Sequence, residues 1–475
     1  MKKTQVAVIG AGPGGYAAAF LAADLGMQVT LIDPSENPGG VCLYRGCIPS
    51  KALLHVADVL NEAKHAEAWG VSFGAPKIDI DRLRAFKTRV VNQLTGGLGQ
   101  LSRQRKITYL RGTAAFKDST TLEVTRQGPD GAGEKESVTF EHAIIATGSH
   151  AARVPGLSID SPRLMDSTGA LDLPDIPKSL LVVGGGYIGL ELGTVYAALG
   201  TKVTVVEMTG GLLPGADRDL VNVLAKRIES ICEAVLLNTK VVSMKEQKTG
   251  IAVTFEGELE QKEQTFDRVL VSIGRKPNPV AGIENTRVVV NARGFIEVDG
   301  ARRTAEPNVY AIGDIVGEPM LAHKASHEGR VAVEAIAGHK VAFEPLAIPA
   351  VVFTDPELAW CGLTESDAQQ QNREVVVARF PWGASGRSLT LDRSDGITKL
   401  ILDPKTERVL GVGIVGPGAG ELIAEGVLAV EMGANASDVK LSIHPHPTLS
   451  ETLMESAEVF FGQATHVYRP RKKQA

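Results

Sequence analysis

Apolar and polar positions at the start of the chain follow the order strand, glycine loop, helix, strand. Residues 4–9 are rich in β-forming residues and run into the glycine-rich loop 10–15, after which residues 17–23 have a helical composition. A second strand, 28–32, ends at Asp33. This order, with an acidic residue at the end of the second strand, is typical of a Rossmann unit that binds a dinucleotide.

Each residue of this fingerprint has a physical task. Gly10 makes the tight turn, Gly12 lets the backbone approach a pyrophosphate, and Gly15 lets the helix pack on the strand. Asp33 can accept a hydrogen bond from a ribose hydroxyl. A tight structural glycine turn is the alternative, because GxGxxG without its flanking elements is weak evidence.

The same pattern returns further along the chain. A strand over 180–183 leads into a second glycine motif that includes Gly186 and Gly189, and a strand over 202–206 ends at Glu207. The sequence therefore predicts two bound dinucleotides. A carboxylate repels a 2′-phosphate and accepts from a free 2′-hydroxyl, and the next arginine is eleven residues away. NAD is thus favoured over NADP at the second unit.

Later strands are expected to complete both units. Strands over 142–149 and 267–275 end in turns at Gly148 and Gly274, where we expect them to border the dinucleotides. A further strand ends at Asp314. An acid at the carboxyl end of a parallel strand lies where ligands bind, although a turn aspartate is the alternative.

The remaining patterns predict the connecting and terminal segments. We expect polar helices over 61–105, an antiparallel excursion over 106–141 with a loop at 128–131, and a fraying tail over 463–475. A separate α+β domain is indicated by strands at 351–353, 375–378, 398–402 and 409–415 and a helix over 420–432. The expected domains are 1–150 and 151–276, a return to the first domain over 277–344, and 345–475.

Cys42 and Cys47 lie five residues apart at the start of a predicted helix, because Pro49 is typical of a first helical turn. The helix N-terminus favours negative charge, so we expect a low pKa for Cys47. In a regular helix their Cα atoms would be about 8 to 9 Å apart, beyond the roughly 7 Å limit for a disulfide. Gly46 permits the irregular backbone that a bridge needs, and a strained bridge suits a redox disulfide. Two inert buried cysteines are the alternative, and the spacing is no metal signature, so no metal is expected.

His446 is held between two prolines and is followed by Glu451. A carboxylate that orients an imidazole gives a plausible acid/base pair. A surface histidine near a helix start is an equally good interpretation of the same residues.

Composition narrows the function classes. The 475 residues carry a formal charge of −5 with a pI near 6.1, which gives no reason to expect a nucleic-acid partner. No uninterrupted apolar run reaches the length of a membrane span. Four cysteines are too few for a secreted disulfide framework of this length, so we expect a cytoplasmic protein.

Together these motifs resemble the flavin-dependent pyridine-nucleotide disulfide oxidoreductases, and among them the dihydrolipoamide dehydrogenases of bacterial 2-oxoacid dehydrogenase complexes. The resemblance covers nearly the whole chain. It is carried by GGVCLYRGCIPSKALL at 39–54, both fingerprints, AIGD at 311–314, MLAHK at 320–324 and HPTLSE at 446–451. It implies an α/β fold with two Rossmann-like domains, for FAD and NAD, and a C-terminal α+β dimerisation domain.

The resemblance also implies residue roles. FAD would be bound by Gly10, Gly12, Gly15, Asp33, Lys51, Gly148, Asp314 and Ala322. NAD would be bound by Gly186, Gly189, Glu191, Glu207 and Gly274, with Glu191 able to pair with Lys51. Cys47 would face the flavin and Cys42 would exchange with substrate, while His446 and Glu451 would come from the other subunit of a homodimer. The implied partners are lipoyl domains of a 2-oxoacid dehydrogenase complex or of the glycine cleavage system.

Other classes of flavoprotein, and departures from the family pattern, bear on this interpretation. Asp33 stands where a longer Glu is common. Pro445 stiffens the approach to His446 without changing the spacing to Glu451. A glutathione-type NADPH reductase would need basic residues after Glu207, and mercuric or large thioredoxin reductases need terminal thiols, whereas no cysteine follows Cys361. A redox-silent flavoprotein scaffold would not need the cysteine pair. Tyr44 and Arg45 replace the small or amide residues typical of this loop, and Arg45 could lower the pKa of the thiols or shift their potential.

Overall fold

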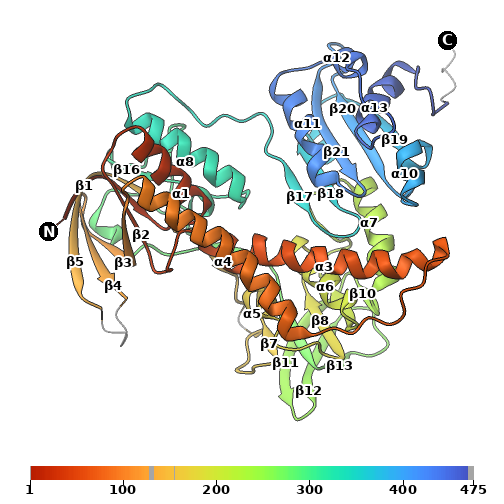
Figure 1. The fold of residues 1–475 in the computed structure, drawn as a ribbon, viewed down its shortest axis with the longest axis horizontal. Coiled ribbons are helices and arrows are strands. Elements are labelled where there is room, and N and C mark those ends of the chain that lie inside the picture. Colours follow the sequence, from red (N-terminus) through yellow and green to blue (C-terminus); the bar gives the residue numbers. More distant parts are fainter. Residues whose placement is uncertain (1, 128–132, 155, 469–475) are drawn as a thin grey trace.

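The computed structural model describes residues 2–127, 133–154 and 156–468, which form three lobes (Figure 1). The first lobe lies at the left of the view, the second at the lower right, and the C-terminal lobe, drawn in blue, at the upper right. The long helices α3 (Cys47–His65) and α4 (Ile80–Gln104) reach from the first lobe across the second. These helices therefore link the first lobe to the second.

The first lobe contains a six-stranded sheet. Its strands are β1 (Lys2–Ile9), β2 (Val29–Asp33), β3 (Thr108–Asp118), β4 (Thr121–Arg126), β5 (Lys135–Ile145) and β16 (Val309–Ala311). β1 pairs in parallel with β2 and β5, and β16 pairs in parallel with β5, while β4 pairs antiparallel with β3 and β5. The strand predicted before Asp314 thus returns to the first sheet. The loop predicted at 128–131 lies outside the described residues.

Small side chains let the helices of the first lobe approach closely. Helix α1 (Pro13–Asp24) buries Ala18, Ala19 and Ala22 in a core that also contains residues of α8 (Ala322–Ile336). A Cβ on Gly329 of α8 would lie 2.7 Å from the Gly14 carbonyl oxygen of α1. The two helices therefore pack side by side over the sheet (Figure 1).

The second lobe repeats the parallel sheet. Its strand order is β10-β9-β8-β14-β7, and all these pairs are parallel. The strands are β7 (Leu164–Met165), β8 (Ser179–Val183), β9 (Lys202–Val206), β10 (Ala234–Leu236) and β14 (Arg268–Val271). The helices are α5 (Ser167–Asp172), α6 (Tyr187–Ala198) and α7 (Arg218–Ile231).

Two smaller sheets of this part of the chain were not predicted from the sequence. β11 (Lys240–Gln247), β12 (Gly250–Glu256) and β13 (Glu263–Phe266) form an antiparallel sheet, and β6 (Ser149–Ala151) pairs antiparallel with β15 (Arg275–Pro277). Most residues of β11 are exposed. Its sequence therefore lacks the alternation of apolar and polar residues that marks a half-buried strand.

The C-terminal lobe is a five-stranded antiparallel sheet with helices, which confirms the predicted α+β character. Its strand order is β17-β18-β21-β20-β19. The strands are β17 (Ala350–Val352), β18 (Leu358–Gly362), β19 (Val376–Pro381), β20 (Ile397–Leu402) and β21 (Val409–Val415). The helices are α9 (Glu365–Gln370), α10 (Gly386–Thr390), α11 (Ala419–Glu431), α12 (Ala436–Leu441) and α13 (Glu451–Phe461).

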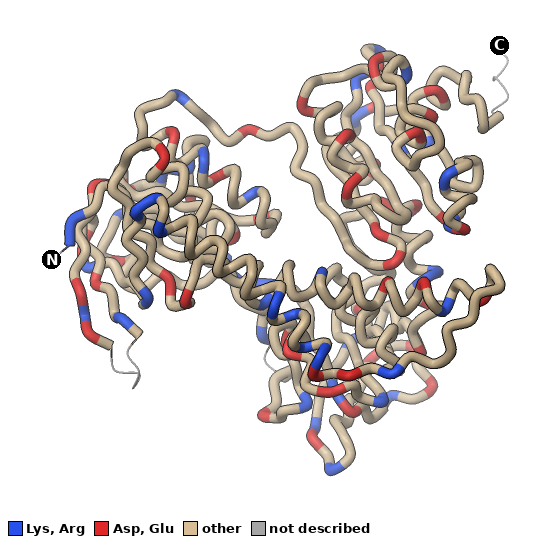
Figure 2. The backbone as a smooth tube through the Cα atoms, viewed as in Figure 1, with Lys and Arg blue, Asp and Glu red and all other residues tan. Residues whose placement is uncertain are grey.

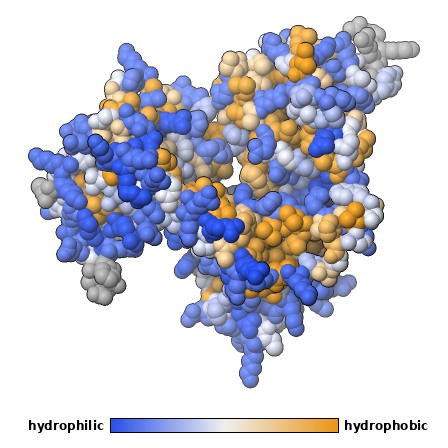
Figure 3. Space-filling model, viewed as in Figure 1, coloured by the Kyte–Doolittle hydropathy of each residue, from blue (hydrophilic) through white to orange (hydrophobic). Residues whose placement is uncertain are grey.

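Charge and hydropathy are distributed differently over the surface. Lys and Arg are interspersed with Asp and Glu over all three lobes, without a single-sign stripe in this view (Figure 2). Apolar residues show over part of the lower right lobe and at the top of the C-terminal lobe, where Figure 1 places α12 (Figure 3). Large exposed apolar side chains in this lobe include Leu428, Met432, Leu441 and Ile443. Within the described ranges, no helix has the length and apolar character needed to cross a membrane.

Candidate active site

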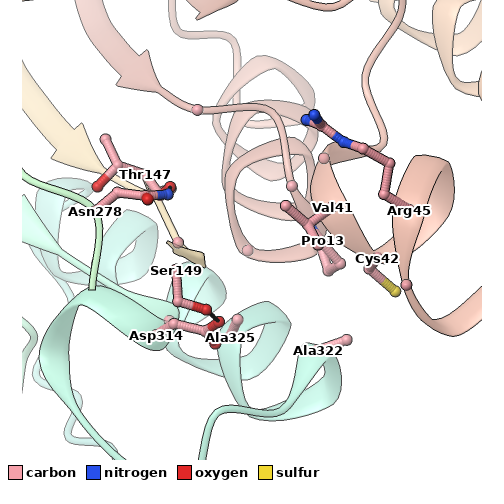
Figure 4. Close-up of a pocket in the computed structure, with 18 of the residues that line it drawn as sticks. Pro13, Val41, Cys42, Arg45, Thr147, Ser149, Asn278, Asp314, Ala322 and Ala325 are labelled. Atoms are coloured by element: carbon pink, nitrogen blue, oxygen red, sulfur yellow. Dashed lines mark hydrogen bonds between the residues drawn. The ribbon is translucent and has the colours of Figure 1, made fainter. Parts of the chain in front are cut away.

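A cavity of about 500 Å3 lies where the first sheet, α1, α2 (Gly40–Arg45), α3 and α6 meet. Figure 4 shows part of its lining, with side chains from α2 on one side and Asp314 and Ala322 on the other. Ten of the residues predicted from the sequence line it. They are Gly10, Gly12, Asp33, Cys42, Cys47, Lys51, Gly148, Glu191, Asp314 and Ala322.

The glycines of the first fingerprint permit close backbone contacts. Gly10 has a φ of +96°, and a Cβ there would lie 2.3 Å from the Ala146 carbonyl oxygen. A Cβ on Gly15 would lie 1.9 Å from the Gly10 carbonyl oxygen. A larger residue at either position would push the helix away from the strand. The close packing therefore requires glycine, as the fingerprint predicts.

The second fingerprint repeats this geometry. Gly184 has a φ of +108°, and its Cβ would lie 2.7 Å from the Ser272 carbonyl oxygen. A Cβ on Gly189 would lie 2.5 Å from the Gly184 carbonyl oxygen, whereas Gly186 faces open space. Gly15, Gly186, Gly189, Glu207 and Gly274 do not line the main cavity, so the second loop forms a separate part of the site.

The acids at the ends of β2 and β9 brace the two glycine loops. The Ala11 amide donates to Asp33 Oδ2 at 2.8 Å and the Ser35 amide donates to Asp33 Oδ1 at 2.8 Å. In the second unit the Gly185 amide donates to Glu207 Oε2 at 2.7 Å. Each carboxylate oxygen has two lone pairs, so both acids can still accept from a ribose hydroxyl.

The Thr209 amide and hydroxyl each donate to Glu207 Oε1 at 2.8 Å. Arg218, the next arginine along the chain, donates instead to the carbonyl oxygens of Leu212, Leu213 and Ala216. Its guanidinium is therefore engaged by backbone carbonyls, and the preference for NAD stands as predicted from the charge of Glu207.

A break in the helix separates the two cysteines. α2 carries Cys42 and ends at Gly46, and α3 begins at Cys47, so the predicted helix start is confirmed. A Cβ on Gly46 would lie 3.0 Å from the Val41 carbonyl oxygen, so the absence of a side chain lets the two helices meet. Both thiols are free, and the structure therefore describes the reduced pair.

The two thiols differ in ionisation. The hydrogen bond from Cys42 lowers the pKa of Cys47 to about 7, against the opposing effect of burial, and the positive charge of Lys51 lowers it further. The same hydrogen bond, with burial, raises the pKa of Cys42 well above its ordinary value. The low pKa expected for Cys47 is confirmed, but its largest cause is the neighbouring thiol and not the helix terminus. In the reduced pair, Cys47 therefore ionises near neutral pH while Cys42 stays a thiol.

Lys51 connects all three lobes at the cavity. Its Nζ donates to Glu191 Oε2 of α6 at 2.8 Å, so the pair expected from the sequence is present. The same ammonium lies 4.3 Å from the centre of the Phe353 ring, and the Phe353 amide donates to Glu191 Oε1 at 3.0 Å. Glu191 is buried, and its charge is matched by these contacts.

A second chain of hydrogen bonds ends at Asp314. The Ser149 hydroxyl donates to Asp314 Oδ2, and Arg275 Nε donates to the Ser149 hydroxyl at 2.7 Å. Arg275 also donates to the Ser149 carbonyl oxygen at 2.7 Å. These bonds fix Asp314 against the antiparallel β6–β15 pair.

His446 and Glu451 form the predicted pair, with His446 Nδ1 and Glu451 Oε1 3.0 Å apart. The Thr448 amide donates to Glu451 Oε2 at 2.8 Å, and this bond and that to the imidazole lower the pKa of the carboxyl despite its partial burial. The His446 side chain is 75% exposed, and neither residue lines the main cavity. Within one chain, the pair is therefore not assembled with the cysteines.

Sequence reasoning did not single out Ser149, Arg275 or Phe353. Ser149 and Arg275 directly follow Gly148 and Gly274, so the repeated turn was a usable signal for both. Phe353 gave no signal, because its contact with Lys51 depends on how the C-terminal lobe packs against α3.

Two dinucleotide loops beside a thiol pair at a helix start define a pyridine-nucleotide and flavin-dependent disulfide oxidoreductase. Comparison with known proteins agrees with this class. Residues 4–329 match the pyridine nucleotide-disulphide oxidoreductase family and residues 348–457 match its dimerisation domain.

The similar curated proteins narrow the class. The chain is 49% identical to the dihydrolipoyl dehydrogenase of Haemophilus influenzae over 99% of this chain and 98% of that protein. It is 45% identical to that of Geobacillus stearothermophilus over 98% of each. The chain therefore belongs to the pyridine nucleotide-disulphide oxidoreductase family and, within it, to the dihydrolipoyl dehydrogenases. It is an oxidoreductase whose cofactors are FAD and NAD.

Solved structures agree with the fold. LpdA from Mycobacterium tuberculosis superposes with a TM-score of 0.87 at 26% identity, covering 97% of this chain and all of that one. The HOCl-induced flavoprotein disulfide reductase RclA from Escherichia coli, in complex with Cu(II), gives a TM-score of 0.86 at 28% identity, covering 97% of this chain and 100% of that one. The predicted class, two Rossmann-like domains and a C-terminal dimerisation domain, is confirmed.

The cavity fits FAD. A Cβ on Gly40 would lie 2.5 Å from the Gly12 Cα, so the two glycines together keep the backbone open at the start of α1. A helix N-terminus of this kind suits a diphosphate. Asp33 and Asp314, which suit a ribose and a polyol chain, border the same cavity.

Proposed function

We propose that the chain oxidises protein-bound dihydrolipoamide to lipoamide with NAD+ through Cys42 and Cys47, with His446 and Glu451 of a second subunit as the acid/base pair. The observation that carries this proposal is the unequal ionisation of the two thiols. A low-pKa thiolate is a good leaving group in disulfide exchange, and Cys47 has that character, whereas Cys42 stays protonated.

The exchange begins with the Cys42–Cys47 disulfide. A substrate thiolate attacks Cys42 Sγ, the bond between the two protein sulfurs breaks, and Cys47 leaves as a thiolate stabilised by Lys51. The second substrate thiolate then attacks the substrate sulfur of the mixed disulfide. Lipoamide is released, Cys42 regains a proton, and the protein has gained two electrons.

His446 supplies and receives the protons of this exchange. Its Nδ1 faces Glu451, which leaves Nε2 free to take a proton from a substrate thiol and return one to Cys42. Thr448 holds Glu451 in place, so the imidazole keeps one orientation. The exposure of His446 supports its use by a second chain.

FAD, when bound, supplies the two-electron chemistry that connects the reduced thiol pair with NAD+. Gly10, Gly12, Gly15, Asp33, Lys51, Gly148, Asp314 and Ala322 would hold it. The protein contributes to this electron transfer by placing Cys47 and Lys51 at the cavity that would hold FAD. Gly186, Gly189, Glu191, Glu207 and Gly274 would bind and orient NAD.

A homodimer is supported by the match to the dimerisation domain, and the exposed apolar side chains of the C-terminal lobe suit a covered face. We further propose lipoyl domains of a 2-oxoacid dehydrogenase complex or the glycine cleavage system as partners, the cytoplasm as location, and domains at 1–150, 151–276, 277–344 and 345–475. The membership of β16 in the first sheet supports the 277–344 return.

The test is the initial rate of NADH formation from dihydrolipoamide and NAD+ by the purified holoenzyme, with NADP+ in a parallel cuvette. We expect turnover with NAD+ and little with NADP+. NADPH-dependent reduction of glutathione disulfide, in place of dihydrolipoamide oxidation, would overturn the proposal in favour of a glutathione-type reductase. A flavin that neither substrate reduces would instead indicate a redox-silent scaffold.

A further inference from the structure

Arg45 lines the cofactor cavity and has no partner among the described residues. It is the last residue of α2, its side chain is exposed, and it borders the cavity together with Gly12, Pro13 and Gly40. Within the described ranges, its guanidinium has no carboxylate within salt-bridge distance and donates no hydrogen bond to another residue. A guanidinium offers five N–H donors, so its hydrogen-bonding capacity is available to a ligand.

The side chain of Arg45 is directed away from the thiol chemistry. Figure 4 shows it extending from α2 on the side of Val41 and Pro13, whereas the Cys42 sulfur points to the opposite side. The positive charge that lowers the pKa of Cys47 is that of Lys51. Arg45 is therefore poorly placed for the effect on the thiols that its sequence position first suggested.

The short helix α2 ties Arg45 to the glycine cradle at the start of α1. Its first residue, Gly40, touches Gly12, the residue that precedes α1. This cradle suits the diphosphate of a dinucleotide, which carries two negative charges. Arginine is well matched to phosphate, because its planar guanidinium can donate two parallel hydrogen bonds.

We propose that Arg45 is a cofactor-binding residue that neutralises the diphosphate of FAD. This inference takes one element from the proposed function, namely that FAD is the group bound at Gly12. Because Arg45 is exposed, its charge acts partly through solvent and is screened by salt. Its contribution should therefore be largest at low ionic strength.

The test follows release of FAD from the holoenzyme after dilution into flavin-free buffer, read from the rise in free flavin fluorescence. We expect Arg45→Met to release FAD about ten times faster than wild type at low salt, with a smaller difference at high salt. Arg45→Lys should lie between them, since it keeps the charge and loses the planar fork. Arg82→Met is the control, because Arg82 is 90% exposed on α4 and its loss changes the net charge equally.

A second readout separates this role from thiol tuning. The thiolate absorbance of the reduced enzyme should titrate at the same pH in Arg45→Met and wild type. If Arg45→Met holds FAD as firmly as wild type at both salt concentrations, the proposal is overturned, and a shifted thiol titration would give Arg45 the other role. Dihydrolipoamide-dependent NADH formation by wild type from the same preparation tests the proposed function separately.

Discussion

Two opposite charges next to the thiol pair adjust the pKa of Cys47 in opposite directions. The positive charge of Lys51 lowers the pKa of Cys47 and the negative charge of Glu191 raises it. Lys51 and Glu191 also pair with each other, so each partly offsets the effect of the other on the thiol. With a pKa of about 7, Cys47 loses its proton as the pH rises through neutrality.

Removing either charge should move this titration in a known direction. We expect Lys51→Gln to move the Cys47 titration upward by about one pH unit, because the thiolate loses a favourable charge. Glu191→Gln should move it downward, because the thiolate loses a repulsive one. The measurement is thiolate absorbance of the reduced enzyme against pH. Shifts of the same sign in both variants would contradict this account.

For single residues, the sequence predicted which cysteine has a low pKa but did not predict the main cause of that low pKa. Cys47 was expected to have a low pKa because Pro49 announced a helix start. The largest cause is the neighbouring Cys42 thiol. The two cysteines lie on separate helices, because α2 ends at Arg45 and α3 begins at Cys47. Neither the separate helix α2 nor the stacking of Lys51 on Phe353 follows from local residue preferences.

At the scale of elements, the two β-α-β units use their terminal acid in the same way. Asp33 accepts from the Ala11 amide in the first glycine loop, and Glu207 accepts from the Gly185 amide in the second. Each acid therefore shapes its own glycine loop, and its remaining lone pairs are available to a ribose hydroxyl. Asp33 has a shorter side chain than Glu207, but its Oδ2 still accepts from the Ala11 amide at 2.8 Å. It therefore stabilises the first glycine loop as Glu207 stabilises the second.

Substitution of Asp33 should therefore weaken FAD binding alone, and substitution of Glu207 should weaken NAD binding alone. We expect Asp33→Asn to weaken FAD retention about tenfold and Glu207→Gln to raise the KM for NAD+ about tenfold with FAD retained, since each loses one charge-assisted hydrogen bond. Flavin content after gel filtration and NAD+ saturation curves measure the two effects. Loss of FAD in Glu207→Gln would show that the units are not independent.

The sequence predicted the regular elements of both units because their strands are apolar and bounded by glycine turns. It missed β6, β15 and the β11–β13 sheet. β6 and β15 have only three residues each, and their pairing joins segments that are distant in the sequence. Short strands without alternation leave no periodic signal, and only the tertiary arrangement selects them.

At the scale of the whole molecule, a buried lysine joins the second lobe to the C-terminal lobe. Lys399 Nζ of β20 donates to Asp217, Asp219 and Glu365 at 2.7 Å each, and its side chain is 1% exposed. The three carboxylates lie close enough for a metal site, but the ammonium already occupies the space among them. Residues this far apart in sequence give no local sign of such a joint.

The proposed function places the active site across two chains, because the acid/base pair lies away from the cavity of its own chain. His446 and Glu451 are paired but do not line the cavity with Cys47. If the pair serves the partner subunit, each site of the dimer combines thiols of one chain with the histidine of the other. Chains with Cys47→Ser or His446→Gln should then be nearly inactive as homodimers, with His446→Gln reduced by about 10² to 10⁴ in turnover.

Mixed dimers of these two inactive chains should recover activity. In a Cys47→Ser/His446→Gln heterodimer, one site carries both substitutions and the other carries neither, so one intact site remains. Random exchange of equal amounts should give about a quarter of wild-type activity, because about half of the dimers are mixed and each has one working site. The measurement is NADH formation by the co-expressed mixture, and double-affinity purification of the two tagged chains then isolates the mixed dimers, which should have about half of wild-type activity. Mixed dimers as inactive as their parents would place His446 and Cys47 of the same chain in one site, because every site would then carry one substitution.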